Sequence, residues 1–192
     1  MNSPVDAPRK RDPERRRQEL LDAATAIIVA RGSAALTHRA AATRADLALG
    51  TATKYFPSID ELREAALREL ERENEEALDA IEHELDRLTP GADLAEVCAA
   101  LMHRFLCDIR QVRASMAIST TAISDERLRS LAMRWTDRLV EILARHISRE
   151  RAVIAETFLN GAMMHAALHA EPLTETSVTN TLHAIFTMSE SR

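Results

Sequence analysis

Aromatic side chains are scarce in this sequence, since Phe, Tyr and Trp together make up only 3% of its 192 residues. Glycine and proline are scarce as well, with 4 and 6 residues. So few helix breakers beside many alanines predict an all-α protein. The low aromatic content gives no sign of an aromatic cage for a cationic ligand. The hydrophobic fraction of 46% is nevertheless enough for a real core.

Cysteine is represented by two residues, Cys98 and Cys107, which lie nine positions apart in one helical stretch. That spacing corresponds to about 13 Å along a helix axis, which is too far for a disulfide. We expect both to be buried small hydrophobes in a reducing cytoplasm. No apolar run approaches the roughly 20 residues that cross a bilayer, and the charged N-terminus lacks the apolar region of a signal peptide. A cytoplasmic protein without a membrane partner is therefore expected.

Catalytic motifs are also missing. The sequence has no phosphate loop, no nucleophile elbow, no Gly-rich dinucleotide turn and no carboxylate pair placed by a motif. We therefore expect neither an enzyme nor a cofactor. His165 and His169 stand four residues apart, as do His103 and Cys107, and either pair could supply two zinc ligands. Because no third ligand is indicated, no metal site is predicted.

Charge is divided unevenly along the chain. The net charge of −5 speaks by itself against nucleic acid as a partner. Residues 1–57, however, hold 10 Lys and Arg against 6 Asp and Glu, whereas residues 58–192 hold 15 against 24. A basic N-terminal part hints at contact with phosphates, although chance clustering gives the same count. Residues 1–12 are expected to form a disordered basic arm that either reaches DNA phosphates or only aids solubility.

Helical spacing and punctuation divide the chain into segments. The first helix is expected over Pro13–Arg31, with Gly32 as its stop. Ser58 and Glu61 form a capping box that opens a long helix to about Leu88. Further helices are expected over about Leu94–Arg110, Arg113–Ile123, Glu126–Ile147, Arg151–Ala170 and Thr174–Met188. We expect a DNA-binding domain over residues 13–60 and a helical ligand-binding and dimerisation domain over residues 61–192.

Residues 32–62 carry the strongest signal. Thr37 is expected to cap a short helix over His38–Arg44, and a second short helix is expected over Leu49–Tyr55. The turn between them places Asp46 where left-handed backbone geometry is required. Two short helices joined by a tight turn are typical of a helix-turn-helix, which lays its second helix into the major groove of DNA.

In this segment the chain resembles the N-terminal domain of TetR (tetracycline-repressor) type regulators, over roughly residues 16–65. The resemblance rests on Gly32, Thr37, Ala41-Ala42, the turn Ala45–Ala48, Gly50-Thr51, Tyr55-Phe56 and the stretch Ser58 to Leu62. It implies an all-α fold, in which a three-helix DNA-binding head is joined to a helical-bundle regulatory and dimerisation domain.

Four departures from the family pattern concern DNA affinity more than fold. Asp46 replaces the turn glycine, and Ala48 replaces the serine that would cap the second short helix, at a cost of about 1 kcal/mol. Thr53 stands where the family has a tyrosine, and Ile59 where it has a lysine, so two frequent phosphate contacts are altered.

The side chains of the two short helices suit DNA contact. Thr hydroxyls and Lys can donate to base edges or phosphates, Arg and a helix N-terminus attract phosphate, and glycine permits close backbone approach. Each Arg could equally be a solvated surface charge, and Tyr55 a core residue beside Phe56. The predicted DNA-binding residues are Thr37, Arg39, Arg44, Gly50, Thr51, Thr53, Lys54 and Tyr55.

The resemblance implies that the last two helices pair with a twofold partner. Stripes of small and apolar residues fit such pairing, although they also fit an intramolecular core. The predicted dimer-interface residues are Ala155, Leu159, Ala162, Ala166, Val178, Leu182 and Ile185. An effector pocket is expected between residues 80 and 170, where plain core packing is the alternative for each residue. The predicted pocket residues are Met102, His103, Phe105, Met116, Thr120, Trp135, Leu139, Phe158 and Met163, with His165 as a further polar contact.

The sequence therefore predicts a transcriptional regulator. We expect a ligand-responsive repressor that binds a palindromic operator in double-stranded DNA as a homodimer and answers to an unknown small-molecule effector. The alternative is a helical protein-interaction module with a vestigial helix-turn-helix, which the altered phosphate contacts and the negative net charge favour. The sequence does not identify the effector, the operator or the regulated genes.

Overall fold

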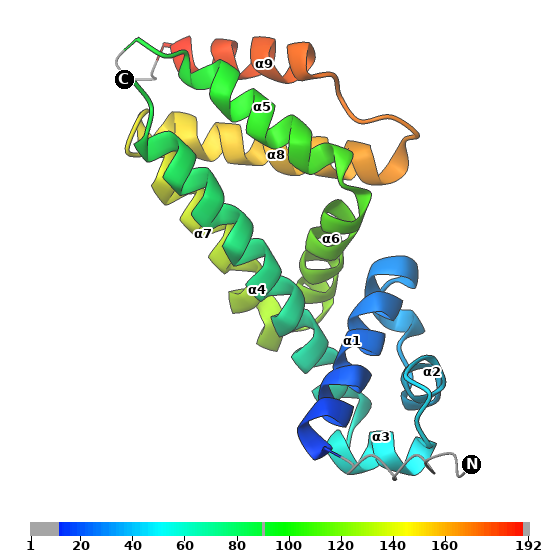
Figure 1. The fold of residues 1–192 in the computed structure, drawn as a ribbon. Helices are drawn as coiled ribbons and strands as arrows, with labels where there is room; N and C mark the ends of the chain where they lie inside the picture. The colour runs from blue at the N-terminus through cyan, green and yellow to red at the C-terminus, as the bar shows by residue number, and fades with distance from the viewer. Residues whose placement is uncertain (1–11, 90, 190–192) are drawn as a thin grey trace, which may run out of the picture.

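The computed structural model describes residues 12–89 and 91–189, and within these ranges every regular element is a helix (Figure 1). The predicted arm falls outside them except for Asp12. The elements are α1 (Pro13–Arg31), η1 (Ser33–Ala35), α2 (His38–Arg44), α3 (Leu49–Tyr55), α4 (Ile59–Asp86), α5 (Leu94–Cys107), α6 (Ile109–Ser124), η2 (Glu126–Leu128), α7 (Arg129–Leu143), α8 (Arg149–Leu168) and α9 (Glu175–Thr187). In the described residues no helix is long and apolar enough to cross a bilayer.

Local signals fix the helices of the N-terminal part as predicted. Asp12 caps α1, because its carboxylate accepts a hydrogen bond of 3.0 Å from the backbone N–H of Glu14. Gly32 ends α1 with φ at 80°, a conformation that costs glycine little. Ser58 opens α4 by accepting a 3.1 Å bond from the N–H of Glu61, as the capping box predicts.

Two predicted boundaries in the C-terminal part are wrong. The chain breaks at Asp108 rather than after Arg110, because the Asp108 carboxylate accepts from the N–H groups of Arg110 and Gln111 at 3.0 and 3.2 Å and so caps α6. The helix expected over Glu126–Ile147 is divided into the 3₁₀ turn η2 and α7, which ends at Leu143. Neither boundary carries a proline or glycine that would have marked it.

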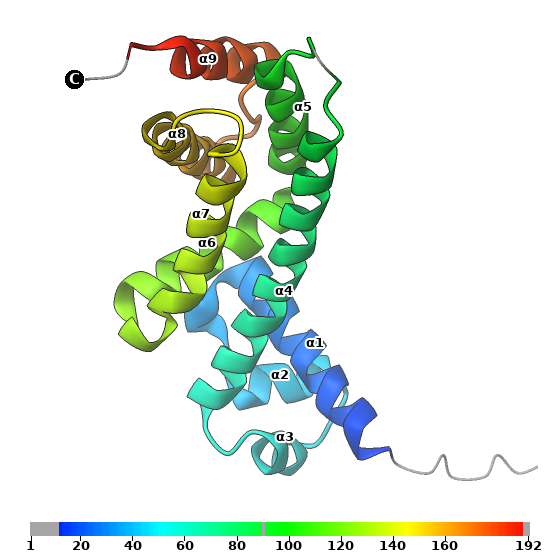
Figure 2. The ribbon, with the colours of Figure 1, turned by 90° about the vertical axis from the view of Figure 1, so that its left-hand side faces the viewer.

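The helices form a head, a shaft and a cap. Helices α1, α2 and α3 make the head at one end, while α4 and α7 run side by side as a shaft toward the opposite end (Figure 1). There α5, α8 and α9 form the cap, and α6 descends from α5 to meet α1 and α4 (Figure 2). The head and the cap are therefore connected through α4 and α6, and the first turn of α7 reaches the head core through Leu131.

Two hydrophobic cores share these two connecting helices. The head core contains the buried faces of α1, α2 and α3 together with Leu62, Leu67 and Leu70 of α4 and Ile118 of α6. The cap core begins at Leu78, further along α4, and extends through α5, α7, α8 and α9. The core that holds the head is thus not confined to residues 13–60.

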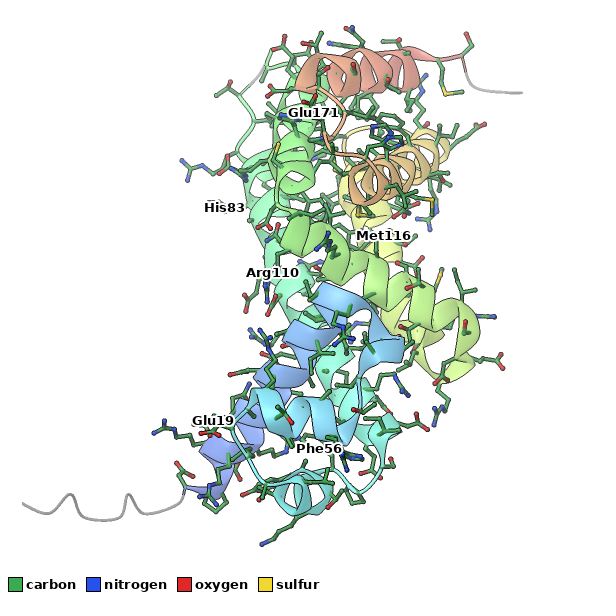
Figure 3. All side chains as sticks on the ribbon, turned by 90° about the vertical axis from the view of Figure 1, so that its right-hand side faces the viewer. Glu19, Phe56, His83, Arg110, Met116 and Glu171 are labelled. Atoms are coloured by element: carbon green, nitrogen blue, oxygen red, sulfur yellow. The ribbon has the colours of Figure 1, made fainter. Side chains whose placement is uncertain are left out.

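Polar contacts fill the section of the shaft between the two cores. Ser115 of α6 donates a hydrogen bond of 3.2 Å to Asn74 of α4, and both side chains are buried. Arg110, labelled in Figure 3, binds Glu73 through two nitrogens at 2.7 and 3.1 Å. Near the C-terminal end of α6, the hydroxyl of Thr121 donates a hydrogen bond of 2.9 Å to the hydroxyl of Ser33 in the head. Helix α6 therefore touches the head and the shaft through directional contacts as well as through packing.

Candidate nucleic-acid interface and ligand site

Alanines allow α2 and α3 to pack closely. Ala41 and Ala42 of α2 and Ala52 of α3 are 0, 2 and 0% exposed. Side chains of this size let two helices approach, and each helix then turns its other face outward. The outer face of α3 lies at the tip of the head, where it is the element farthest from the cap (Figure 2).

The two ends of α3 are held by backbone geometry and by one aromatic anchor. Asp46 adopts a left-handed conformation with φ at 53°, as predicted, and Ala48 starts α3 without a side-chain cap. Phe56, labelled in Figure 3, follows the helix and is 4% exposed. The guanidinium carbon of Arg17 lies 5.0 Å from the centre of its ring, within cation–π range. Phe56 therefore anchors the C-terminal end of α3 in the head.

The structure brings the eight predicted DNA-binding residues to one end of the molecule. Thr51 and Tyr55 are half-buried, whereas Thr37, Arg39, Arg44, Gly50, Thr53 and Lys54 are exposed. In the described residues none of Arg39, Arg44 and Lys54 forms an ion pair, so their charges are open to phosphates. The hydroxyl of Thr53 turns inward to the carbonyl oxygens of Leu49 and Gly50 at 3.4 and 3.3 Å. Because the hydroxyl is engaged, the methyl group of Thr53 is the part of the side chain that can contact a thymine methyl group.

One exposed residue of this surface was not predicted. Leu49, the first residue of α3, is 43% exposed although it is a large apolar side chain. No sequence signal marks this exposure, because an apolar residue at the start of an amphipathic helix is usually a core contact. Its exposure beside Gly50 adds an apolar contact point to the tip of the head.

The predicted pocket residues divide between two places. Met102, Phe105, Trp135 and Leu139 meet around an internal cavity of about 30 Å³ between α4, α5, α7 and α8. The rings of Phe105 and Trp135 stack there, with centroids 5.9 Å apart and planes inclined by 27°. The remaining lining residues are Ile81, Cys98, Leu101, Leu143 and Leu159. Typical ligand pockets measure about 300–1,000 Å³, so a ligand must widen this cavity to enter it.

Met116 and Thr120 lie elsewhere, in a groove of about 460 Å³ between α6, α7 and α8. Three methionines and an exposed isoleucine give the groove an apolar surface. Its lining residues are Met116, Ser119, Thr120, Ala122, Ile123, Arg129, Ala132, Met133, Thr136, Asn160 and Met164. The sequence spacing had grouped Met116 with the internal cavity, but α6 turns this side chain toward α8 (Figure 3).

The other candidates face neither space. The ring of His103 donates through Nδ1 to the carbonyl oxygen of Leu173 at 3.1 Å, because a carbonyl can only accept. Phe158 and Met163 pack in the cap core. The His165 ring stacks on His169 with centroids 4.0 Å apart. In residues 12–89 and 91–189, no group of three His, Cys, Asp or Glu residues is placed to hold a metal ion.

The predicted dimer face requires a correction. All seven predicted residues are buried within a single chain, with exposed fractions between 0 and 9%. They are Ala155, Leu159, Ala162, Ala166, Val178, Leu182 and Ile185. These small and apolar side chains pack α8 and α9 into the cap of a single chain. This is the intramolecular core that the sequence analysis gave as the alternative to a dimer interface.

The cysteines are both free, and their environments differ. Cys98 is buried as predicted, and burial raises the pKa of its thiol to about 12. Cys107 is exposed, which corrects the prediction that both are core residues. It is the last residue of α5, where the chain turns into α6, and its sulfur lies 3.5 Å from Nε2 of His103.

Comparison with solved structures gives full-length matches. No family model matches the chain, and no curated protein sequence matches it significantly. The multidrug binding protein EbrR in complex with imidazole shares 28% identity, with a TM-score of 0.75 over 92% of this chain and 97% of the other. SCO1917, a TetR family member from Streptomyces coelicolor A3, also shares 28% identity, with a TM-score of 0.77 over 90% and 99%. EbrR has further structures with malachite green, proflavin and ethidium. The predicted all-α architecture with an N-terminal helix-turn-helix head is thereby confirmed.

Proposed function

Because this chain is a member of the TetR family of transcriptional regulators, we propose that it is a ligand-responsive repressor that binds a palindromic operator as a homodimer in the cytoplasm. One observation carries the DNA-binding part of this proposal. The exposed face of α3 presents Gly50, Thr53 and Lys54 at the tip of the head, held by alanine packing against α2. A helix presented in this way fits the major groove.

A direct test is selection of DNA from a random library by the purified protein at physiological salt, followed by sequencing of the bound pool. We expect a palindrome with half-sites about one helical turn apart, roughly 34–36 Å. An unenriched pool would favour the protein-interaction module instead. Salt provides a second discriminator, since phosphate contacts make DNA affinity fall steeply as salt rises and apolar protein contacts do not.

Variants of the reading helix test its placement. Lys54→Ala should weaken operator binding and make the slope of log affinity against log salt shallower by about two, because each of the two protomers loses one phosphate contact. Tyr55→Ala should weaken binding as well. Arg87→Ala is the matched control, because Arg87 is an exposed cation at the far end of α4. Full operator affinity in both head variants would overturn the placement of the reading helix.

For the homodimer, the exposed face of α8 is the better candidate. Val153, Thr157, Gly161, Met164 and Leu168 recur every three or four residues, so they lie on one side of the helix. The exposed fraction is 45% for Val153, 51% for Met164 and 76% for Leu168, the three large apolar residues of this face. A contiguous apolar stripe of this kind is typically covered by a partner. Two copies of the same stripe can pair around a twofold axis.

Gly161 permits a clean test of this interface. A Cβ built at Gly161 meets no other atom within 4 Å, so a larger residue fits the single chain. Gly161→Glu should therefore keep the helical content and convert the dimer to a monomer in light scattering. A dimer that persists unchanged would show that another surface pairs the chains.

The effector response is proposed to act through α6. Expansion of the cap around the cavity would shift α5 and α6, and α6 contacts the head through Ser33 and the head core. In the dimer such a shift changes the separation of the two reading helices, and linkage requires that DNA weaken effector binding in return. Trp135, the single tryptophan of the chain, lines the cavity and reports its occupation by fluorescence.

A further inference from the structure

The outward surface of α3 consists of a central ridge and two flanks. Ala52 is buried, so the side of the helix opposite it faces away from the head. Successive residues of a helix turn by about 100°, which places Gly50 and Lys54 about 160° from Ala52 and makes them the ridge. Leu49 and Thr53 lie about 60° and 100° from Ala52 on one flank. Both of these side chains are exposed, and α3 forms the tip of the molecule (Figure 2).

The two flanks differ in their relation to the head core. On one flank, Thr51 and Tyr55 are half-buried, and Tyr55 packs against the head core. On the other flank, Leu49 is 43% exposed and, within the described residues, belongs to neither hydrophobic core. Single exposed leucines are common on protein surfaces, so exposure alone indicates no role. The position of Leu49 beside the ridge, on the surface that the proposed function lays against DNA, is what indicates one.

Thr53 extends this flank with a methyl group. Its hydroxyl donates to the carbonyl oxygens of Leu49 and Gly50 at 3.4 and 3.3 Å, so the hydroxyl is used within the helix. Leu49 and Thr53 are four residues apart, which makes them neighbours on the helix surface, about 6 Å apart along the axis. The leucine side chain and the threonine methyl group together form one apolar strip, which we call the apolar edge of α3.

The chemistry of the apolar edge matches one base. In the major groove, guanine, adenine and cytosine present nitrogen and oxygen donors or acceptors, and only thymine adds a methyl group, at C5. Apolar side chains laid against a polar base edge remove its water and return no hydrogen bond, which costs free energy. Against the thymine methyl group they bury apolar surface on both partners, which is favourable. The apolar edge therefore favours thymine.

We propose that the apolar edge of α3, formed by Leu49 and the methyl group of Thr53, contacts thymine C5-methyl groups in each half-site and so selects thymine there. This inference rests on the proposed operator binding and names the base that one side of the reading helix selects. The two side chains are about 6 Å apart along the helix, which equals about two base-pair steps of about 3.4 Å. The selected thymines are therefore expected within about three consecutive base pairs.

Uracil in place of thymine tests the contact without changing the protein. Uracil keeps the pairing edge and O4 of thymine and lacks only the C5-methyl group. The operator is taken from the random-library selection, in which enzymatic amplification leaves thymine as the only base with a C5-methyl group. We expect uracil at the contacted positions of both half-sites to weaken binding by the full-length wild-type protein at least about tenfold, because each half-site loses a buried methyl contact. Uracil outside the half-sites is the control and should have no effect.

Protein variants assign this loss to the apolar edge. Leu49→Ala should reduce the difference between the thymine and uracil operators to less than about threefold, because a double-mutant cycle isolates the contact between the leucine and the methyl group. Ile109→Ala is the matched control, since Ile109 is also the first residue of its helix, is 44% exposed and lies outside the head. It should keep the full difference. Thermal unfolding verifies that both variants retain the fold.

A pair of substitutions at Thr53 separates its methyl group from its hydroxyl. Thr53→Val keeps the methyl group and removes the hydroxyl, so it should keep the preference for thymine over uracil. Thr53→Ser keeps the hydroxyl and removes the methyl group, so it should lower that preference. The reverse result would assign the contact to the hydroxyl and overturn the proposal.

Other results also decide against the apolar edge. Equal affinity of the wild type for the thymine and uracil operators would overturn the proposal, as would an unchanged preference in Leu49→Ala or selected half-sites without thymine. Each of these results leaves the proposed regulator intact, because an operator is still bound. A selection without any enriched DNA would overturn both proposals, so the two failures are distinguishable.

Discussion

The Nε2 atom of His38 donates a hydrogen bond of 2.8 Å to the main-chain carbonyl oxygen of Phe56, and this contact joins the first turn of α2 to the residue that ends α3. A carbonyl oxygen only accepts, so Nε2 carries the proton. Phe56 is also held by burial of its ring and by Arg17 above it. The two short helices are therefore linked at the turn and again at their outer ends.

His38→Ala should loosen the reading helix. The substitution leaves the Phe56 carbonyl without its donor, which typically costs about 1 kcal/mol of stability. We expect a lower melting temperature and weaker operator binding with unchanged dimerisation, measured by thermal unfolding, DNA titration and light scattering. Arg39→Ala is the neighbouring control: it should weaken DNA binding and leave the melting temperature nearly unchanged, because Arg39 is exposed. Equal melting temperatures for His38→Ala and the wild type would contradict the role given to this bond.

Ala48→Ser should stabilise the head. Ala48 starts α3 with extended backbone geometry and offers no side-chain acceptor to the first N–H groups of the helix. A serine at this position can accept one of them, and such a cap contributes about 1 kcal/mol. Thermal unfolding should show a higher melting temperature for Ala48→Ser. Thr37→Ala provides the mirror experiment, since it removes the existing 3.1 Å cap bond to Ala40 and should lower stability by a similar amount. A melting temperature unchanged by Ala48→Ser would mean that water already satisfies the N-terminus of α3.

The head was the part of the molecule that local sequence could predict. Caps at Thr37 and Ser58, a stop at Gly32 and a left-handed turn at Asp46 each act within a few residues. Because these effects are local, one sequence determines them without knowledge of tertiary contacts. The bounds of the first three helices follow from them.

The cap was less predictable because its organisation depends on contacts between distant residues. A stripe of small residues on α8 is compatible with packing inside one chain or between two chains, and only the fold shows that Ala155 and Ala162 face inward. The same limitation applies to the pocket, since Trp135 lines the internal cavity and Met116 lines the groove between α6, α7 and α8. The burial of Glu156, which is 5% exposed, gave no sequence signal either, because a glutamate in a helix is ordinarily exposed.

Glu71→Gln should stabilise the protein at neutral pH. Glu71 is buried on the shaft. This burial is the main cause that raises the pKa of its carboxyl above the usual 4.5, and the negative charge of Glu75 nearby is the second cause. The ionised carboxylate therefore costs stability above its raised pKa, and that cost disappears as the pH falls below 4.5 and the carboxyl is protonated in both states. Melting curves should show a gain for Glu71→Gln at pH 7 that vanishes in acid. A loss at pH 7 would mean that the attraction of Arg134, whose Nε lies 3.1 Å away, outweighs burial.

Glu82→Gln should have the opposite effect on the same shaft. Arg138 of α7 and Arg145, in the turn that follows α7, donate hydrogen bonds to Glu82, which hold the pKa of its carboxyl below the usual 4.5. Its ionised form therefore stabilises the fold above pH 4.5, and this contribution is lost as the pH falls through the lowered pKa. The melting temperature of Glu82→Gln should lie below that of the wild type at pH 7 and approach it in acid. Differences of the same sign for Glu71→Gln and Glu82→Gln would contradict this account of the shaft.

The two cysteines should differ sharply in reactivity. A thiolate attacks maleimide where the reagent can reach it, and the Cys98 thiol is both buried and held protonated by a pKa raised to about 12. Cys107 is exposed at the end of α5, so mass spectrometry of the native protein should find one adduct, located at Cys107. In guanidinium chloride both residues should react, and Cys107→Ser should abolish labelling of the native protein. Because Cys98 lines the internal cavity, a ligand that widens the cap could expose it. Native labelling of Cys98 without ligand would show instead that the cap opens spontaneously on the time scale of the reaction.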